Sequence, residues 1–371
     1  MDPIAHTFTG AALAASGLRR ATPLATAALV LGANAPDIDI VAAFGPDFSS
    51  VAHRRGWTHG LPAIAAFPFL VTGLLLAWDR LVRLRLRPGA APIRAGPLLG
   101  IAALGVATHS TLDWLNNYGI RWLMPFDGQW FYGDALFIID PWIWLALGGS
   151  LFLMHARRIP SLAAWCAFWL LASVLVFATA DVPQAARWLW VAGIGVLLGA
   201  RAAGLSAPAR ERGVERVTRA ALVVCVAYMA AASIANITAR AEVRAALAVR
   251  GFGPVGHLMI GPVPANPFGG DVVAETPAAY FTGRWNWLAR PRFESGSQIS
   301  RLAPNTVSEA AAGTPEVQRF LTWARFPYFE IETADSGHHT VRFRDARYLG
   351  TDRLGSPTVI LDGDLEPLYV D

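Results

Sequence analysis

Long apolar runs are the feature that most constrains how this chain of 371 residues can fold. A transmembrane helix needs about 20 consecutive, mainly apolar residues to cross the hydrocarbon core of a bilayer. Runs close to that length occur six times, at 61–79, 96–114, 136–154, 161–180, 187–205 and 217–236. None carries Lys or Arg away from its margins, except Arg201 near the end of the fifth run. The sequence therefore predicts about six membrane-spanning helices.

The composition supports a membrane protein. Only 16% of the residues are charged, whereas about a quarter are charged in an average soluble domain, and the mean hydropathy is +0.39. The net charge of +4 does not indicate nucleic-acid binding, because the arginines lie mainly beside helix ends and in the C-terminal region, and no nucleic-acid motif is present. Cys166 and Cys225 both fall in predicted spans, so neither a disulfide framework nor a thiolate zinc site is expected.

Arginine clusters predict the orientation in the membrane. They flank every second predicted span, at residues 19–20, 80–94, 157–158 and 201–219. By the positive-inside rule these loops are cytoplasmic, and the opposite loops, 37–60, 115–135 and 181–186, face outward. The N-terminus lacks a basic stretch before its first apolar segment, so no cleavable signal peptide is expected. We predict a multi-pass protein of the plasma membrane, the inner membrane in bacteria, with its C-terminal region outside, in the periplasm.

The two ends of the chain differ from the central part. The apolar stretches 4–18 and 22–35 are shorter than a span, which predicts a short N-terminal helical hairpin. From residue 241 the sequence becomes rich in Pro, Gly, Asn and charge, with strand-like segments 328–333 and 340–348 around a turn at 335–337. The predicted fold is mainly α: a helical membrane domain over 1–240 and a small α+β extramembrane domain over 241–371.

Histidines and aspartates are concentrated near the ends of apolar segments in the first 113 residues. His109 and Asp113 are four residues apart and so lie on one face of a helix. Asp37 and Asp39 follow Pro36, and an extended stretch can direct both carboxylates at one cation. The predicted topology places the whole set on the outward side. The sequence therefore predicts a metal site within residues 1–145, with the candidate ligands His6, Asp37, Asp39, His53, His59, His109 and Asp113.

The residue types indicate which ions such a site would bind. Imidazole and carboxylate ligands without thiolates suit zinc, manganese or iron(II), and we expect zinc, with one to three ions held. Ions in such a site activate water and bind both oxygens of an in-line displacement at a phosphate ester. Arg54 and Arg55 are expected to bind a substrate phosphate or to orient a metal ligand. Asp140 precedes Pro141 and is either a helix N-cap or a group that orients a ligand histidine.

At these residues the chain resembles a family of membrane-bound metal-dependent hydrolases, the relatives of the inner-membrane protein YdjM, which are distantly similar to zinc-dependent phospholipase C. The resemblance covers residues 1 to about 145. It implies hydrolysis at a metal centre, with a phosphoester as the expected substrate. The matching segments are Ala5-His6-Thr7, 36–39, 53–59, 109–113 and 137–141.

Three functions follow as hypotheses. The first is a metal-dependent hydrolase that uses metal-activated water to cleave a phosphoester of a lipid or lipid-linked substrate, with membrane lipids as its surroundings. The second is a transporter that binds a cation in transit. The spans predicted after residue 160 contain almost no polar residues, which argues against a transport pathway there. The third is a non-catalytic membrane scaffold with a structural metal.

Overall fold

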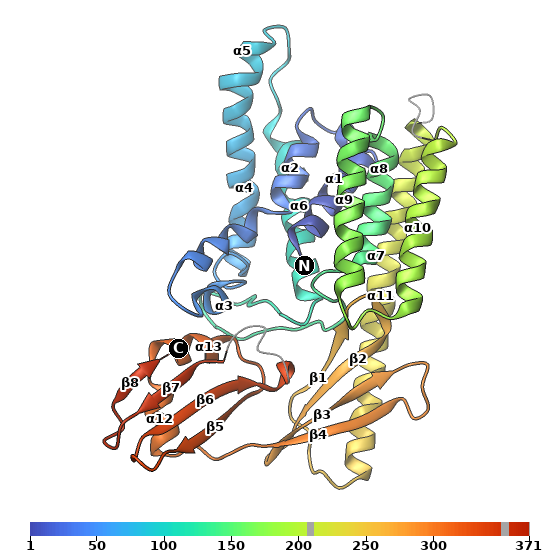
Figure 1. Ribbon diagram of the computed structural model, residues 1–371. Helices are drawn as coiled ribbons and strands as arrows, with labels where there is room; N and C mark the ends of the chain where they lie inside the picture. The colour runs from blue at the N-terminus through green and yellow to red at the C-terminus, as the bar shows by residue number, and fades with distance from the viewer. Residues whose placement is uncertain (206–210, 350–355, 371) are drawn as a thin grey trace. The chain divides into compact units, whose positions relative to one another are not determined.

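The computed structural model describes residues 1–205, 211–349 and 356–370. The N-terminal two thirds of the chain is helical, and the extended strands lie in the C-terminal third (Figure 1). The chain forms two compact units. The first unit comprises residues 1–38, 55–235 and 262–267, and the second comprises residues 39–54, 236–261 and 268–371. Segment 39–54 thus groups with the C-terminal residues although it lies between two helices of the first unit.

The helices of the first unit begin with the predicted N-terminal hairpin, which is confirmed as two short helices. Asp2 caps the first of them by accepting hydrogen bonds from the amides of Ile4 and Ala5, and Pro3 occupies its first position. The helices are α1 (Pro3–Ala15), η1 (Leu18–Arg20), α2 (Ala25–Gly32), α4 (Leu61–Trp78), η3 (Asp79–Arg83), α5 (Leu84–Leu86), α6 (Ala95–Trp114), α7 (Pro141–Ile143), η4 (Trp144–Gly148), α8 (Gly149–His155), α9 (Ile159–Ala178), α10 (Gln184–Ala202) and α11 (Glu211–Val249).

Four helical stretches in the described part of the chain are long and apolar enough to cross a membrane. They are Leu61–Leu86, Ala95–Trp114, Ile159–Ala178 and Arg212–Val249. A fifth candidate is α2 together with η2 (Ala35–Phe44), a pair bent by 43°. The predicted class, a helical membrane protein with a small sheet domain, is confirmed.

The number of spans differs from the six predicted. The apolar run 136–154 forms a helix only from Pro141 to His155, because Asp140 caps its start. The run 187–205 corresponds to α10, which carries Arg187 and Arg201 and is not among the candidate spans found in the described residues.

Glycines allow α1, α2 and α6 to pack unusually closely. A Cβ atom added at Gly10 or at Gly105 would lie 2.7 Å from the carbonyl oxygen of Leu29, and one added at Gly32 would lie 2.7 Å from that of Ala102. Helices in membranes use such small residues to bring their backbones together. This packing brings His109 of α6 to the C-terminal end of α2, where its ring contacts the carbonyl oxygen of Ala33.

Helix α11 continues beyond the predicted span, which ended near residue 236. Ala239, Val243 and Leu247 are spaced at four-residue intervals and are buried against a sheet in the second unit. This apolar stripe gives the extension a surface to pack on, so the helix persists to Val249.

The second unit contains two four-stranded sheets, with strand orders β1-β2-β3-β4 and β5-β6-β7-β8. In the second sheet β5 and β6 pair antiparallel, with Phe329 opposite Phe343, and the turn at 335–337 joins them as predicted. The elements of this unit, besides η2 and the end of α11, are α3 (Ser49–His53), β1 (Leu258–Val263), β2 (Asn266–Glu275), β3 (Ala279–Asn286), β4 (Phe293–Ser300), α12 (Thr306–Ala312), α13 (Pro315–Trp323), β5 (Pro327–Thr333), β6 (His339–Asp345), η6 (Ala346–Tyr348), β7 (Thr358–Leu361) and β8 (Pro367–Val370).

Candidate metal site

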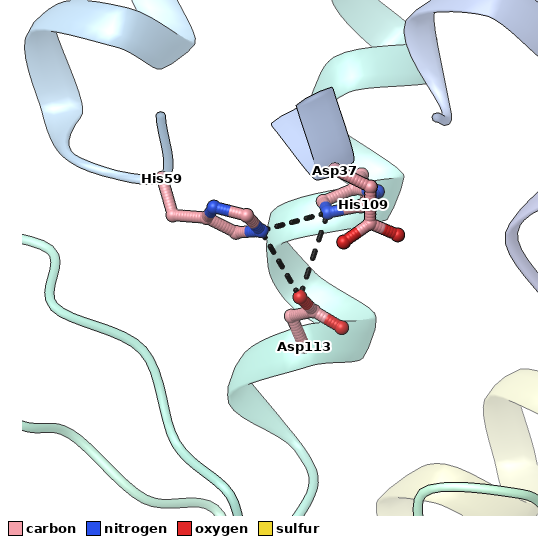
Figure 2. A group of neighbouring side chains, drawn as sticks. All are labelled: Asp37, His59, His109 and Asp113. Carbon is pink, nitrogen blue, oxygen red and sulfur yellow. Dashed lines mark hydrogen bonds and ion pairs between the residues drawn. The ribbon is translucent and has the colours of Figure 1, made fainter. Parts of the chain in front are cut away.

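Four of the seven predicted ligands come together in the first unit. His109 and Asp113 lie one turn apart on α6, His59 comes from the turn before α4, and Asp37 comes from η2 (Figure 2). One ligand atom from each residue lies within 4.8 Å of those of the other three. His59, His109 and Asp113 are each completely buried. Residues far apart in the sequence therefore direct two imidazoles and two carboxylates at one point.

The imidazoles meet through their Nε2 atoms. His59 Nε2 lies 3.0 Å from His109 Nε2 and 3.1 Å from Asp113 Oδ2. His109 Nε2 lies 3.5 Å from the same carboxylate oxygen. Figure 2 shows these three side chains converging, with Asp37 beside them.

The backbone of α2 fixes the tautomer of His109. Its Nδ1 lies 2.7 Å from the carbonyl oxygen of Ala33, the residue that ends α2. A carbonyl can only accept, so Nδ1 carries the proton and donates it. In the neutral ring this leaves a lone pair on Nε2, directed at His59 and Asp113. Metal-binding histidines are oriented in the same way, by a hydrogen bond from the other ring nitrogen.

Thr58 controls His59 from the opposite side of that ring. The hydroxyl of Thr58 lies 2.9 Å from His59 Nδ1 and can either donate to it or accept from it. His59 can therefore present either a proton or a lone pair at Nε2. With a proton it donates to His109 or Asp113, and with a lone pair it is a metal ligand.

Asp113 accepts from nitrogen donors on two sides. Arg55 Nε lies 3.0 Å from Asp113 Oδ2, and the α-amino group of Met1 donates to Oδ1. Arg55 also donates to the side chain of Asn116, at 2.7 Å, and lies over the ring of Tyr118. Burial lowers the pKa of the Met1 amino group to about 6. Arg55 is only 2% exposed, and its contact with Asp113 orients that ligand.

His6 lies next to the cluster without belonging to the group of four. Its ring stacks on that of His109, with centroids 3.9 Å apart, and its Nε2 lies 3.2 Å from Asp113 Oδ1. Its other nitrogen, Nδ1, is buried and has no hydrogen-bond partner among the described residues. The imidazole of His6 is thus a possible fifth ligand beside the group of four.

Three further predicted site residues, Asp39, His53 and Arg54, belong to the second unit. There Arg54 Nε is 3.5 Å from Asp39 Oδ1, and His53 Nδ1 is 3.0 Å from the carbonyl oxygen of Ser49. Their assignment to the metal site stays a prediction.

Asp140 functions as a helix N-cap. Its Oδ1 accepts from the amides of Trp142 and Ile143, and its Oδ2 accepts from the hydroxyl of Tyr228 at 2.8 Å. Of the two roles that the sequence left open, the structure therefore shows the cap.

Three partners of the cluster were not found from the sequence. They are the carbonyl of Ala33, the side chain of Asn116 and the amino group of Met1. A backbone carbonyl leaves no trace in the sequence. The position of Asn116, three residues after Asp113, is the only feature of the sequence that could have predicted its place beside the cluster.

The arrangement fits a divalent metal ion. His59 Nε2, His109 Nε2 and Asp113 Oδ2 lie within 3.5 Å of one another, so one ion could be bound by all three, while Arg55 balances part of the charge of Asp113. Two nitrogen and two oxygen ligands suit the ions expected from the sequence. We conclude that Asp37, His59, His109 and Asp113 form a candidate metal site.

Comparison with known proteins agrees with the motifs in the N-terminal half. Residues 1–182 match the model of a family described as YdjM inner membrane protein, which confirms the resemblance noted over residues 1–145. A relative from Bacillus subtilis (strain 168), described as uncharacterized protein YfhP, is 24% identical over 135 residues. That match spans 36% of this chain and 38% of the relative. No solved structure matches the chain. The family match and the apolar helices together indicate a membrane protein.

Proposed function

We propose that this protein is a membrane-bound metal-dependent hydrolase that cleaves a phosphoester of a lipid or lipid-linked substrate. The observation that carries the proposal is the convergence of His59 Nε2, His109 Nε2 and the carboxylates of Asp37 and Asp113 on one buried point. The likeness of the motifs to a family of metal-dependent hydrolases supports the reaction class.

The chemistry follows from the ligand set. A divalent ion held by these four residues would act as a Lewis acid on a phosphoryl oxygen and lower the pKa of water toward neutrality. Zinc is the proposed ion. The protein orients the ligands through hydrogen bonds and an ion pair. The carbonyl of Ala33 contacts His109, the hydroxyl of Thr58 contacts His59, and the guanidinium of Arg55 contacts Asp113. Burial strengthens these interactions because bulk water does not screen them.

The membrane setting supports a lipid as substrate. His109 and Asp113 belong to α6, which is itself a candidate span, and His59 directly precedes another at Leu61–Leu86. Lipid molecules would surround these helices in the bilayer, so a lipid is the class of substrate nearest to the site. A lipid phosphoester has both a bond that this chemistry can cleave and an affinity for the membrane.

Metal content and hydrolysis test the proposal together. Full-length protein purified in detergent without chelators is expected to hold at least one zinc per chain, measured by inductively coupled plasma mass spectrometry. His59→Ala and His109→Ala are expected to lose that metal, while His155→Ala, an exposed histidine outside the cluster, retains it. Thermal unfolding of each variant checks that it is folded. Absence of any transition metal from the wild-type protein would contradict the proposal.

Hydrolysis is measured in the same preparations. Release of phosphorylated or free headgroups from vesicles of extracted bacterial lipid, followed by mass spectrometry, is expected for the wild type. The activity should disappear with 1,10-phenanthroline and return when zinc is added. Metal uptake into proteoliposomes without ester cleavage would favour the transporter hypothesis, and bound metal with neither activity would favour the scaffold.

A further inference from the structure

An apolar groove lies between α1 and α9, away from the four ligands. It has a cavity volume of about 460 Å³ and is lined by Pro3, Ile4, Thr7 and Phe8 of α1 and by Ser161, Ala164, Trp165 and Phe168 of α9. The two helices lie side by side in the first unit (Figure 1). The groove is open at the surface, since Ile4 is 37% exposed and Pro3 and Ala164 are exposed too.

The walls of the groove are aromatic and held by one another. The ring of Phe8 stacks on Trp165, with centroids 5.7 Å apart, and meets Phe168 edge to face at 5.3 Å. Trp165 and Phe168 pack together at 5.9 Å. Such mutually packed rings resist collapse into the space between them, so the groove is a preformed feature.

The two hydroxyl groups of the lining are hydrogen-bonded within the protein, and the indole N–H of Trp165 is its other polar side-chain group. The hydroxyl of Thr7 shares hydrogen bonds with the side chain of Asn34, and that of Ser161 donates to the carbonyls of His155 and Arg158. No charged side chain lines the groove among the described residues. Apart from the indole N–H of Trp165, the lining therefore offers an occupant almost entirely apolar surface, which favours a hydrocarbon.

The surroundings of α9 supply that hydrocarbon. This helix is a candidate span, and its outer surface carries Leu170 and Leu171 at 66% and 70% exposure. In a bilayer, an open groove on such a helix is filled by acyl chains. An occupant gains dispersion contacts with the fixed rings, because a void would leave their atoms without neighbours.

Helix α1 joins this groove to the candidate metal site. Pro3, Ile4 and Thr7 line the groove, whereas Met1 contacts Asp113 and His6 stacks on His109. The groove and the ligand cluster are thus bordered by the same two turns of one helix. A lipid whose chain lies in the groove would have its headgroup region within a short distance of those turns.

We propose that the groove between α1 and α9 binds an acyl chain of the lipid substrate. That the bound lipid is a substrate rests on the proposed function. That the groove binds an acyl chain rests on the residues that line it. Selection of the substrate would then depend on the fit of its hydrocarbon as well as on the chemistry of its headgroup.

Photocrosslinking tests the binding separately from the reaction. The full-length protein is placed in nanodiscs containing a phosphatidylethanolamine with a diazirine in one acyl chain, irradiated, digested and analysed by mass spectrometry. The wild type is expected to be labelled at Phe8, Trp165 or their neighbours. Ala164→Phe, which fills the groove, should reduce this labelling to background. Ala163→Phe adds the same ring to an exposed position outside the lining and should leave it unchanged.

The kinetics of soluble short-chain phosphatidylethanolamines link the groove to the reaction. Below the critical micelle concentration, each methylene entering the groove should lower KM by up to about fourfold in the wild type. Ala164→Phe should remove this chain-length dependence, whereas Ala163→Phe should retain it.

The two experiments separate the two proposals. Equal labelling of the wild type and Ala164→Phe would overturn the proposal that the groove binds an acyl chain, even if lipid hydrolysis is found. Groove labelling without hydrolysis of any lipid would leave a lipid-binding site and overturn its link to a substrate.

Discussion

His109 is fixed by an atom that no sequence pattern identifies, the carbonyl oxygen of Ala33. Asp113, one turn further along α6, is fixed by Arg55 and by the Met1 amino group. Both ligands therefore depend on segments far from them in the chain. At this scale, the positions of the supporting groups decide whether the imidazole and the carboxylate point at one another.

Replacing Arg55 tests how strongly Asp113 depends on its support. Arg55→Met leaves a buried carboxylate without its guanidinium partner, so the free energy of unfolding of metal-free protein should fall by about 3–5 kcal/mol. Unfolding in mixed detergent and SDS measures the change. Arg284→Met is the control, because that side chain is 80% exposed and its loss should cost less than about 1 kcal/mol. Equal effects of the two substitutions would show that the ion pair between Arg55 and Asp113 stabilises the fold no more than an exposed ion pair does.

At the scale of elements, the close approach of α2 and α6 is what builds the site. Gly105 on α6 faces Leu29 of α2, and Gly32 on α2 faces α6 at Ala102. The contact sets the distance between His109 and Ala33. Two glycines, neither of which touches a metal ion, thus determine the orientation of a ligand.

Gly105→Ala should separate these helices. Its Cβ would lie 2.7 Å from the Leu29 carbonyl oxygen and 3.1 Å from the Ala33 nitrogen, so α6 must shift and the His109 hydrogen bond must lengthen. Loss of such an orienting bond lowers metal affinity by about 10–100-fold. Competition with a zinc-binding dye measures the affinity. Gly100→Ala on the same helix meets no atom within 4 Å and should bind zinc as the wild type does.

In the second unit, β3 carries a buried phenol whose ionisation opposes folding. The hydroxyl of Tyr280 donates to the carbonyl of Pro327, and burial raises its pKa to about 12, against the opposing effect of Arg301. Because the folded pKa exceeds the unfolded value near 10, this stabilisation is complete below pH 10 and is lost as pH rises through 12. The difference between the tyrosinate absorbance of wild type and Tyr280→Phe should titrate near 12, and a midpoint near 10 would contradict this.

At the scale of the whole molecule, the three candidate spans after the arginine-rich loop and the five spans predicted there from the sequence lead to the same topology. From the arginine-rich loop at 87–94 to the C-terminal region, the candidate spans are α6, α9 and α11. Adding both 141–155 and α10 raises three crossings to five. Either number is odd, so the loop and the C-terminal region are expected on opposite sides of the membrane.

Cysteine labelling checks this expectation. Cys166 and Cys225 are first replaced by alanine, and a single cysteine is placed at Gly89 or at Ser336. The positive-inside rule places the arginine-rich loop inside. A membrane-impermeant maleimide added to intact spheroplasts should then label position 336, and position 89 only after lysis. Labelling of both positions in intact spheroplasts would refute the predicted orientation.

The sequence by itself determined the class of this protein and much of its candidate site. Six apolar runs predicted a helical membrane protein, because crossing a bilayer imposes a length and a composition that can be read directly. The spacing of His109 and Asp113 predicted a shared face, because helix geometry is local. The alternating segments near residue 335 predicted a hairpin for the same reason.

Only the tertiary structure decided which residues meet. His109 meets the end of α2 because glycines let α1, α2 and α6 approach, while Asp37 joins from η2 and His59 from the turn before α4. Such contacts between distant segments have no periodic pattern. The tertiary structure also decided that Arg55 contacts Asp113 and that Asp39 and His53 belong to the second unit. Local rules predict the types of ligand, whereas their convergence depends on the distance between backbones.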